Sequence, residues 1–206
     1  MIRGRRVSSS SPYDLPLDLG ARLDAIAAPI PDPAPLRYAA VIAPLLPAID
    51  DSGPRLLLIE RAGTLRKHAG QLAFPGGKPE PEDRDLLDTA LREAEEEVSL
   101  DRAEVSVLGR LAPVPTPSGY LIIPYVARVL SDWTPKALDR QEVARTLTPS
   151  LRSLCDPATY TWRGSAEWQG QHYELHEFAI HTPPLWGATA RMVFDLLQRL
   201  EIEPRP

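Results

Sequence analysis

Cysteine is almost absent from this sequence. Cys155 is the only cysteine among the 206 residues, so an internal disulfide is impossible. A single thiol suits a reducing compartment and is a poor starting point for a zinc site. We therefore expect a cytoplasmic protein.

Long apolar runs and an excess of positive charge are also missing. No hydrophobic stretch approaches the roughly 20 residues that a membrane-spanning helix needs. The net charge is −5 at pH 7, so the bulk charge favours neither nucleic acid nor an anionic membrane as a partner. Hydrophobic residues still make up 43% of the chain, which is enough for the core of one domain.

Residues 1–33 are expected to form a flexible N-terminal tail, separate from the domain. The tail begins with basic residues and serines but has no apolar segment after them, unlike a secretory signal; a transit-like leader is the alternative. A weak helical pattern over residues 15–30 allows a short helix, and the proline-rich stretch 29–35 is typical of a stiff linker. The domain would then cover residues 34–206 and end in a C-terminal helix.

The remaining pattern mixes helices and strands without a βαβ repeat, which predicts an α+β fold. Thr148 is expected to cap a short helix over residues 148–156. Apolar, β-branched or alternating stretches predict strands over residues 38–46, 55–60, 104–112, 119–130 and 172–180. The first two of these strands, separated by turn residues, are expected to lie side by side.

Carboxylates gather between residues 80 and 104, within and around a predicted helix over residues 85–98. At about 100° per residue, Glu93, Glu96 and Glu97 share one face of this helix. Their mutual repulsion costs roughly 0.2–0.5 kcal/mol per pair. A divalent cation would offset that cost, because Mg²⁺ binds carboxylate oxygens. A solvated acidic face is the alternative.

A glycine pair precedes the helix. Phe74 and Pro75 lead into Gly76 and Gly77, whose lack of side chains lets a ligand or metal approach the backbone closely. An ordinary turn explains such a pair when it stands alone, but not its place directly before the carboxylate helix.

The segment from Gly77 to Leu100 resembles the Nudix box, G-x5-E-x7-R-E-U-x-E-E-x-G-U, where U is a bulky aliphatic residue. Gly77, the run from Arg92 to Glu97 and Leu100 fit this pattern, with a small alanine at the first U. Asp83 stands where the first glutamate belongs, eight residues rather than seven separate it from Arg92, and Ser99 replaces the second glycine.

The segment upstream resembles the coenzyme A pyrophosphatase branch of that family. Its signature is L-L-T-x-R-[SA]-x3-R-x3-G-x3-F-P-G-G, and residues 57–77 fit every fixed position except Ile59, where threonine is usual. Residues 116–120 and 185–190 also look like segments of that branch, so the resemblance covers roughly residues 36–200.

This resemblance implies a Nudix α/β/α sandwich, with a mixed β-sheet between helices. It implies a hydrolase that uses Mg²⁺ or Mn²⁺ to cleave the pyrophosphate bond of a nucleoside diphosphate derivative. The substrate would be coenzyme A or an acyl-CoA, cleaved to 3′,5′-ADP and 4′-phosphopantetheine. Glu93, Glu96, Glu97 and the backbone at Gly77 would bind the metal, and Arg92 would position a glutamate.

Positive side chains beside the glycine pair are expected to bind the phosphates of the substrate, including the extra 3′-phosphate of coenzyme A. The expected contacts are Arg61, Arg66, Lys67 and Lys78, together with the backbone of Gly76 and Gly77. A solvated basic loop is the alternative for each of these charges, and His68 is equally ambiguous.

Other functions remain open at this point. The substrate could be ADP-ribose, NADH or a nucleoside triphosphate, and a non-catalytic nucleotide-binding relative would be expected to lose ligand glutamates. His172 and His176 suggest zinc, but four residues of a strand span about 13 Å, too far to share one ion. The expected partner is a small nucleotide, bound by a monomer or a homodimer.

Overall fold

The computed structural model describes residues 15–64, 68–130, 133–136, 141–168 and 170–204. Its helices are α1 (Leu19–Arg22), α2 (Leu86–Val98), α3 (Leu151–Leu154), α4 (Gly187–Arg199) and the short 3₁₀ helix η1 (Arg102–Glu104). Its strands are β1 (Arg37–Leu46), β2 (Arg55–Leu56), β3 (Leu58–Arg61), β4 (Leu72–Ala73), β5 (Gly76–Gly77), β6 (Val105–Arg110), β7 (Val114–Thr116), β8 (Tyr120–Val129), β9 (Val143–Leu147), β10 (Tyr160–Trp168) and β11 (Gln171–Phe178).

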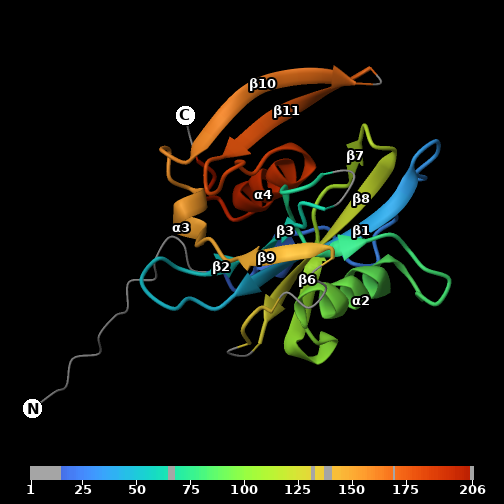
Figure 1. The fold of residues 1–206 in the computed structure, drawn as a ribbon, viewed down its shortest axis with the longest axis horizontal. Helices are drawn as coiled ribbons and strands as arrows, with labels where there is room; N and C mark the ends of the chain where they lie inside the picture. Colours follow the sequence, from blue (N-terminus) through green and yellow to red (C-terminus); the bar gives the residue numbers. More distant parts are fainter. Residues whose placement is uncertain (1–14, 65–67, 131–132, 137–140, 169, 205–206) are drawn as a thin grey trace, which may run out of the picture.

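The central sheet is mixed, as expected for an α+β fold. Its strands run in the order β2-β1-β8-β6, with β5 on β1 and β7 on β8. The long β1–β8 pair is parallel, whereas β2 and β6 pair antiparallel with their neighbours. A second sheet has the order β4-β3-β9, and β10 and β11 form a hairpin that extends above α4 (Figure 1).

Helices cover both faces of the central sheet. Alternate residues of β1 point to opposite sides, so that Ile42 joins the hydrophobic core under α2 and Val41 joins the core under α4. The α2 core includes Ala90 and Ala94, whose small side chains bring the helix close to the sheet. Figure 1 shows α2 and α4 on opposite sides of β1 and β8. The expected sandwich of a mixed sheet between helices is confirmed.

Several predicted elements differ in their partners or boundaries. Strand β2 pairs with β1 at Leu45↔Leu56, but the chain then crosses to the second sheet as β3. The cap of the short helix is Ser150, which accepts a hydrogen bond from the Ser153 N–H at 3.1 Å. Thr148 was wrong as the cap, because the chain stays extended there and Pro149 accepts from Leu56 N–H. Strands β9 and β10 were not predicted.

Residues 15–33 pack on the domain, which differs from the expected flexible tail. Leu19 and Leu23 are buried in the α4 core, and Ile30 packs against the α2 core. Arg110 of β6 donates a 2.6 Å hydrogen bond to the Ala28 carbonyl. The proline-rich stretch therefore does not isolate this segment, because its apolar side chains cover the sheet. Residues 1–14 of the expected tail lie outside the described residues.

No helix in the described ranges is both long and apolar enough to cross a membrane.

Replacing Leu19 tests whether the N-terminal segment belongs to the core. Leu19 is 1% exposed, so Leu19→Ala should lower the free energy of unfolding by about 2–4 kcal/mol. Leu17 is fully exposed, and Leu17→Ala should change the free energy of unfolding by no more than about 0.5 kcal/mol. Urea denaturation measures both. Equal effects would mean that the segment does not contribute to the folded core.

Candidate active site

Helix α2 has a defined cap at each end. The Asp85 side chain accepts from Asp88 N–H at 2.8 Å, which caps the first turn. The helix ends at Ser99, which adopts the left-handed conformation (φ 61°) at the position where the motif has glycine. A non-glycine residue in this conformation costs about 1–2 kcal/mol. The serine therefore changes the cost of ending the helix but not the place where it ends.

The two glycines of β5 lie between β1 and α2. Gly77 pairs with Ala40 and Gly76 with Val41. A Cβ atom on Gly77 would overlap the Glu93 carboxylate, and one on Gly76 would overlap the β1 backbone. Gly76 also has φ 152°, which residues with side chains rarely adopt. Both positions require glycine, Gly77 because its backbone lies against the Glu93 carboxylate and Gly76 because its backbone lies against β1.

Glu97 is the most unusual side chain of the site. It is 2% exposed, and its Oε2 accepts a hydrogen bond from Gly76 N–H at 3.0 Å. Its Oε1 is buried without a hydrogen-bond partner among the described residues. Burial raises the pKa of Glu97 to about 8, and the neighbouring charge of Glu93 adds to the rise. A buried carboxylate oxygen without a partner fits a divalent cation as its missing contact.

Glu93 and Glu97 face the glycine pair, whereas Glu96 does not. Burial raises the pKa of Glu93, although Arg92 opposes the rise. The Glu96 side chain is 58% exposed and accepts from Arg92 at 3.1 Å. In the parts of the chain that the structure describes, no three acidic, histidine or cysteine side chains are gathered closely enough to hold a metal ion. Glu96 would have to turn away from Arg92 to join the other two.

Arg92 is held by Asp83 in a two-point ion pair. Its Nε and Nη2 donate to Oδ1 and Oδ2 of Asp83 at 2.9 and 3.1 Å, and Nη2 also reaches Glu93 Oε1 at 3.2 Å. The Asp83 side chain is only 4% exposed, and its bonds to Arg92 lower its pKa to about 2. Thr89 and the Glu80 N–H donate to the same carboxylate. Asp83 therefore anchors the arginine despite the longer spacer.

The predicted substrate-binding residues lie in different places. Arg61 ends β3, has a buried Nε without a described partner, and its positive charge lowers the pKa of Glu97 against the larger effect of burial. Lys78 is exposed, and its carbonyl accepts from Arg92. His68 is exposed and contacts Gln71 at 2.8 Å. Arg66 and Lys67 lie outside the described residues.

Glu142 is a further member of the site that the sequence did not indicate. Its backbone carbonyl accepts from Ala62 N–H at 2.7 Å, at the start of the β9–β3 pairing. Its negative charge contributes to the raised pKa of both Glu93 and Glu97. No local sequence signal identifies Glu142, because only the pairing of β9 with β3 brings it to the carboxylates of α2.

The two histidines considered as zinc ligands lie on a strand, as predicted. His172 and His176 are both in β11. His176 is buried and makes a 3.0 Å hydrogen bond with the Tyr160 hydroxyl. Its ring also stacks on Phe194. His176 therefore contributes to the packing between the hairpin and α4.

Comparisons with known proteins agree with this geometry. A family model described as "NUDIX domain" matches residues 39–158. The "Uncharacterized Nudix hydrolase NudL" of Photorhabdus laumondii is 38% identical over 166 residues, which cover 81% of this chain and 86% of that protein. The protein of the same description from Yersinia enterocolitica is 38% identical over 162 residues, covering 77% and 80%. A solved MutT/nudix family protein from Enterococcus faecalis has a TM-score of 0.52 at 17% identity, covering 85% of this chain and 68% of that one.

The raised pKa of Glu97 predicts how stability depends on pH in the metal-free protein. The carboxyl group ionises near pH 8 in the folded state and near its ordinary 4.5 when unfolded. Between these values the folded state binds more protons, so the free energy of unfolding falls as pH rises. Glu97→Gln should remove this part of the slope, whereas Glu95→Gln, at an exposed position, should retain it. Thermal unfolding in EDTA from pH 5 to 8 measures the slopes, and parallel curves for all three proteins would contradict the assignment.

Proposed function

The chain belongs to the Nudix hydrolase family, and from this premise we propose that it hydrolyses the pyrophosphate bond of coenzyme A or an acyl-CoA. The products would be 3′,5′-ADP and 4′-phosphopantetheine. The observation that best supports hydrolysis is the buried, unpartnered Oε1 of Glu97 beside Glu93 and the glycine pair. A non-catalytic relative would not be expected to retain all three glutamates of the motif.

The choice of coenzyme A rests on the signature over residues 57–77. Its one departure, Ile59, is fully buried in the α2 core and pairs with Ala73 and Thr146 across the second sheet. Isoleucine in place of threonine therefore changes the packing of β3 and not the chemistry of an open pocket. This placement supports coenzyme A as the proposed substrate despite the departure.

In the proposed mechanism, α2 supplies the metal ligands. Glu93, Glu96 and Glu97 would hold Mg²⁺ or Mn²⁺ together with the backbone at Gly77. When bound, such a cation neutralises phosphate charge and activates a water. The Gly76 N–H fixes one oxygen of Glu97 and leaves the other free for the cation. Arg92, anchored by Asp83, keeps Glu93 turned toward the glycine pair.

Arg61 is proposed to contact the pyrophosphate being cleaved. Its positive charge lowers the pKa of Glu97, which supports a role for Arg61 near the carboxylates of α2. A guanidinium can bind two phosphate oxygens at once, and the partner that its buried Nε lacks would then be a phosphate. Arg61 would then contact the bond that breaks, and other residues would bind the 3′-phosphate of coenzyme A.

Removing the charge of Glu97 should abolish most of the activity. With Mg²⁺ or Mn²⁺ present, Glu97→Gln should lower kcat by about 100-fold or more, because the cation loses a buried anionic ligand. Glu95→Gln is the matched control, since Glu95 is exposed on the same helix, and it should stay within about twofold of wild type. Phosphate-release kinetics measure both. Full turnover by Glu97→Gln at saturating metal would exclude the proposed role.

A substrate comparison tests the choice of coenzyme A. We expect kcat/KM for coenzyme A to exceed that for dephospho-CoA by about one to two decades, the value of one charge-assisted phosphate contact. ADP-ribose, NADH and deoxynucleoside triphosphates should be cleaved far more slowly. If one of these is instead cleaved most efficiently, the family assignment stands and the proposed substrate does not.

A further inference from the structure

Two positive side chains meet at one tyrosine ring beside the glycine pair. Arg37 begins β1 and lies directly opposite Tyr120 of β8 in the parallel register. The guanidinium carbon of Arg37 is 4.6 Å from the centroid of the Tyr120 ring, and Lys78 Nζ is 6.0 Å from the same centroid. Three segments far apart in sequence thus form a cluster of Arg37, Lys78 and Tyr120.

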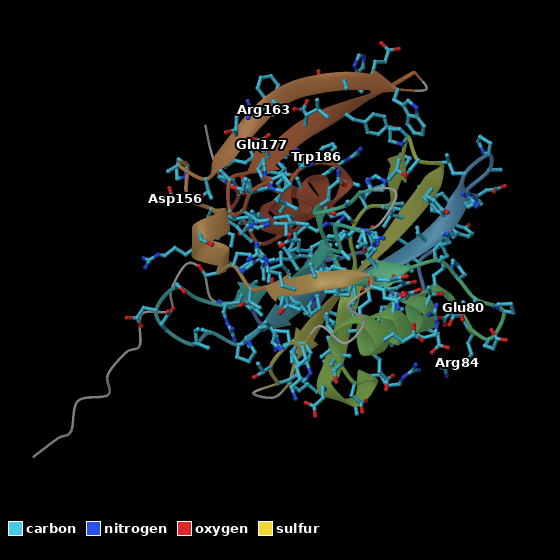
Figure 2. The ribbon with its side chains drawn as sticks, viewed as in Figure 1. Glu80, Arg84, Asp156, Arg163, Glu177 and Trp186 are labelled. Atoms are coloured by element: carbon cyan, nitrogen blue, oxygen red, sulfur yellow. The ribbon has the colours of Figure 1, made fainter. Side chains whose placement is uncertain are left out.

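Neither cation of this cluster has an acidic partner in the part of the chain that the structure describes. Among the described residues, no carboxylate lies within ion-pair distance of Arg37 or Lys78, although the chain is acidic overall. Other exposed arginines do have acidic partners, as Arg84 has with Asp88 and Arg163 has with Glu177. Figure 2 shows Arg163 and Glu177 together on the hairpin, well away from Glu80 and Arg84 beside α2. The cluster therefore offers positive charge to a ligand.

The cluster is connected to the proposed metal site through Gly77. Lys78 follows Gly77 directly, and its carbonyl is held by Arg92. Ala40 pairs with Gly77, and Arg37 is three residues along the same strand, roughly 10 Å away. Strand alternation turns the cluster to the face opposite α2, but β5 is only two residues long and pairs with β1 alone within the described sheet. The proposed substrate would therefore have to pass around this edge.

The aromatic contact prepares Arg37 to bind a phosphate. A guanidinium stacked over an aromatic ring is restrained, while its N–H groups at the edge remain free to donate to two oxygens of one phosphate. Lys78 would add a second positive charge from the other segment. A nucleobase is a poorer fit, because the cations occupy positions over the ring on which it would stack.

We propose that Arg37, Lys78 and Tyr120 form the subsite that binds the non-reacting phosphate of the substrate, the 3′-phosphate of its adenosine half. This inference rests on the proposed function. Of the side chains expected to bind the phosphates, namely Arg61, Arg66, Lys67 and Lys78, it assigns Lys78 to the 3′-phosphate and adds Arg37 and Tyr120. Arg61, whose positive charge lowers the pKa of Glu97, is not part of this cluster. The cluster would therefore discriminate between substrates without taking part in bond cleavage.

Calorimetry with adenosine 3′,5′-bisphosphate and AMP tests the subsite without turnover. The wild-type protein with Mg²⁺ should bind the bisphosphate roughly 10–100-fold more tightly than AMP. Arg37→Gln and Lys78→Gln should each reduce this advantage by about tenfold while leaving the affinity for AMP within about twofold. The matched control is Arg191→Gln, because Arg191 lies 4.7 Å over the ring of Tyr173 in a similar contact on α4 and β11. It should bind both ligands like wild type.

The proposal is overturned if wild type binds the two nucleotides equally or binds neither. It is also overturned if the double variant Arg37→Gln/Lys78→Gln, with an unchanged melting temperature, retains the full advantage. Kinetics separate this result from the proposed function. A protein that prefers the bisphosphate but does not cleave coenzyme A would retain the subsite and lose the proposed reaction. A protein that cleaves coenzyme A but does not prefer the bisphosphate would support the proposed reaction and exclude the subsite.

Discussion

The active site depends on burying one carboxylate, that of Glu97, against the backbone of β5. An ionised carboxylate loses much of its hydration in such a position, and the Gly76 N–H replaces only one contact. The surrounding structure makes this burial possible. Small alanines bring α2 close to the sheet, and glycines allow β5 to lie between the helix and β1. The raised pKa of Glu97 is the result, and a bound cation would lower it by stabilising the ionised form.

Ion pairs around Arg92 hold the acidic side chains of α2 in position. Asp83 is ionised across most of the pH range, because Arg92 and two other donors hold it. Arg92 in turn contacts Glu93 and Glu96, so a single guanidinium connects the loop before α2 with its acidic face. Surface ion pairs contribute little on their own, but a two-point pair with a nearly buried partner restricts geometry as well as adding energy.

Local patterns predicted what lies close together in the sequence. The extent of α2, the shared face of Glu93 and Glu97 and the need for glycine at Gly76 and Gly77 all follow from spacing within about 25 residues. Predictions failed where pairing between strands distant in sequence determines which residues meet. Residue 142 reaches the site through β9, and residue 37 reaches Tyr120 through the parallel β1–β8 register. The exposure of Glu96 was also not predicted. Helical periodicity indicates on which face of α2 Glu96 lies, but it does not indicate that the side chain pairs with Arg92.

The attachment of the N-terminal segment has a consequence for the order of folding. Arg22 and Arg199 exchange hydrogen bonds with each other's backbone carbonyls across 177 positions of sequence, and Leu19 inserts among residues of the α4 core. Such contacts close a loop of nearly the whole domain, so they form late, after nearer contacts have built the surface they need. Leu19 and Arg22 are synthesised before α4, so they can make these native contacts only after α4 has been synthesised and has packed on the sheet.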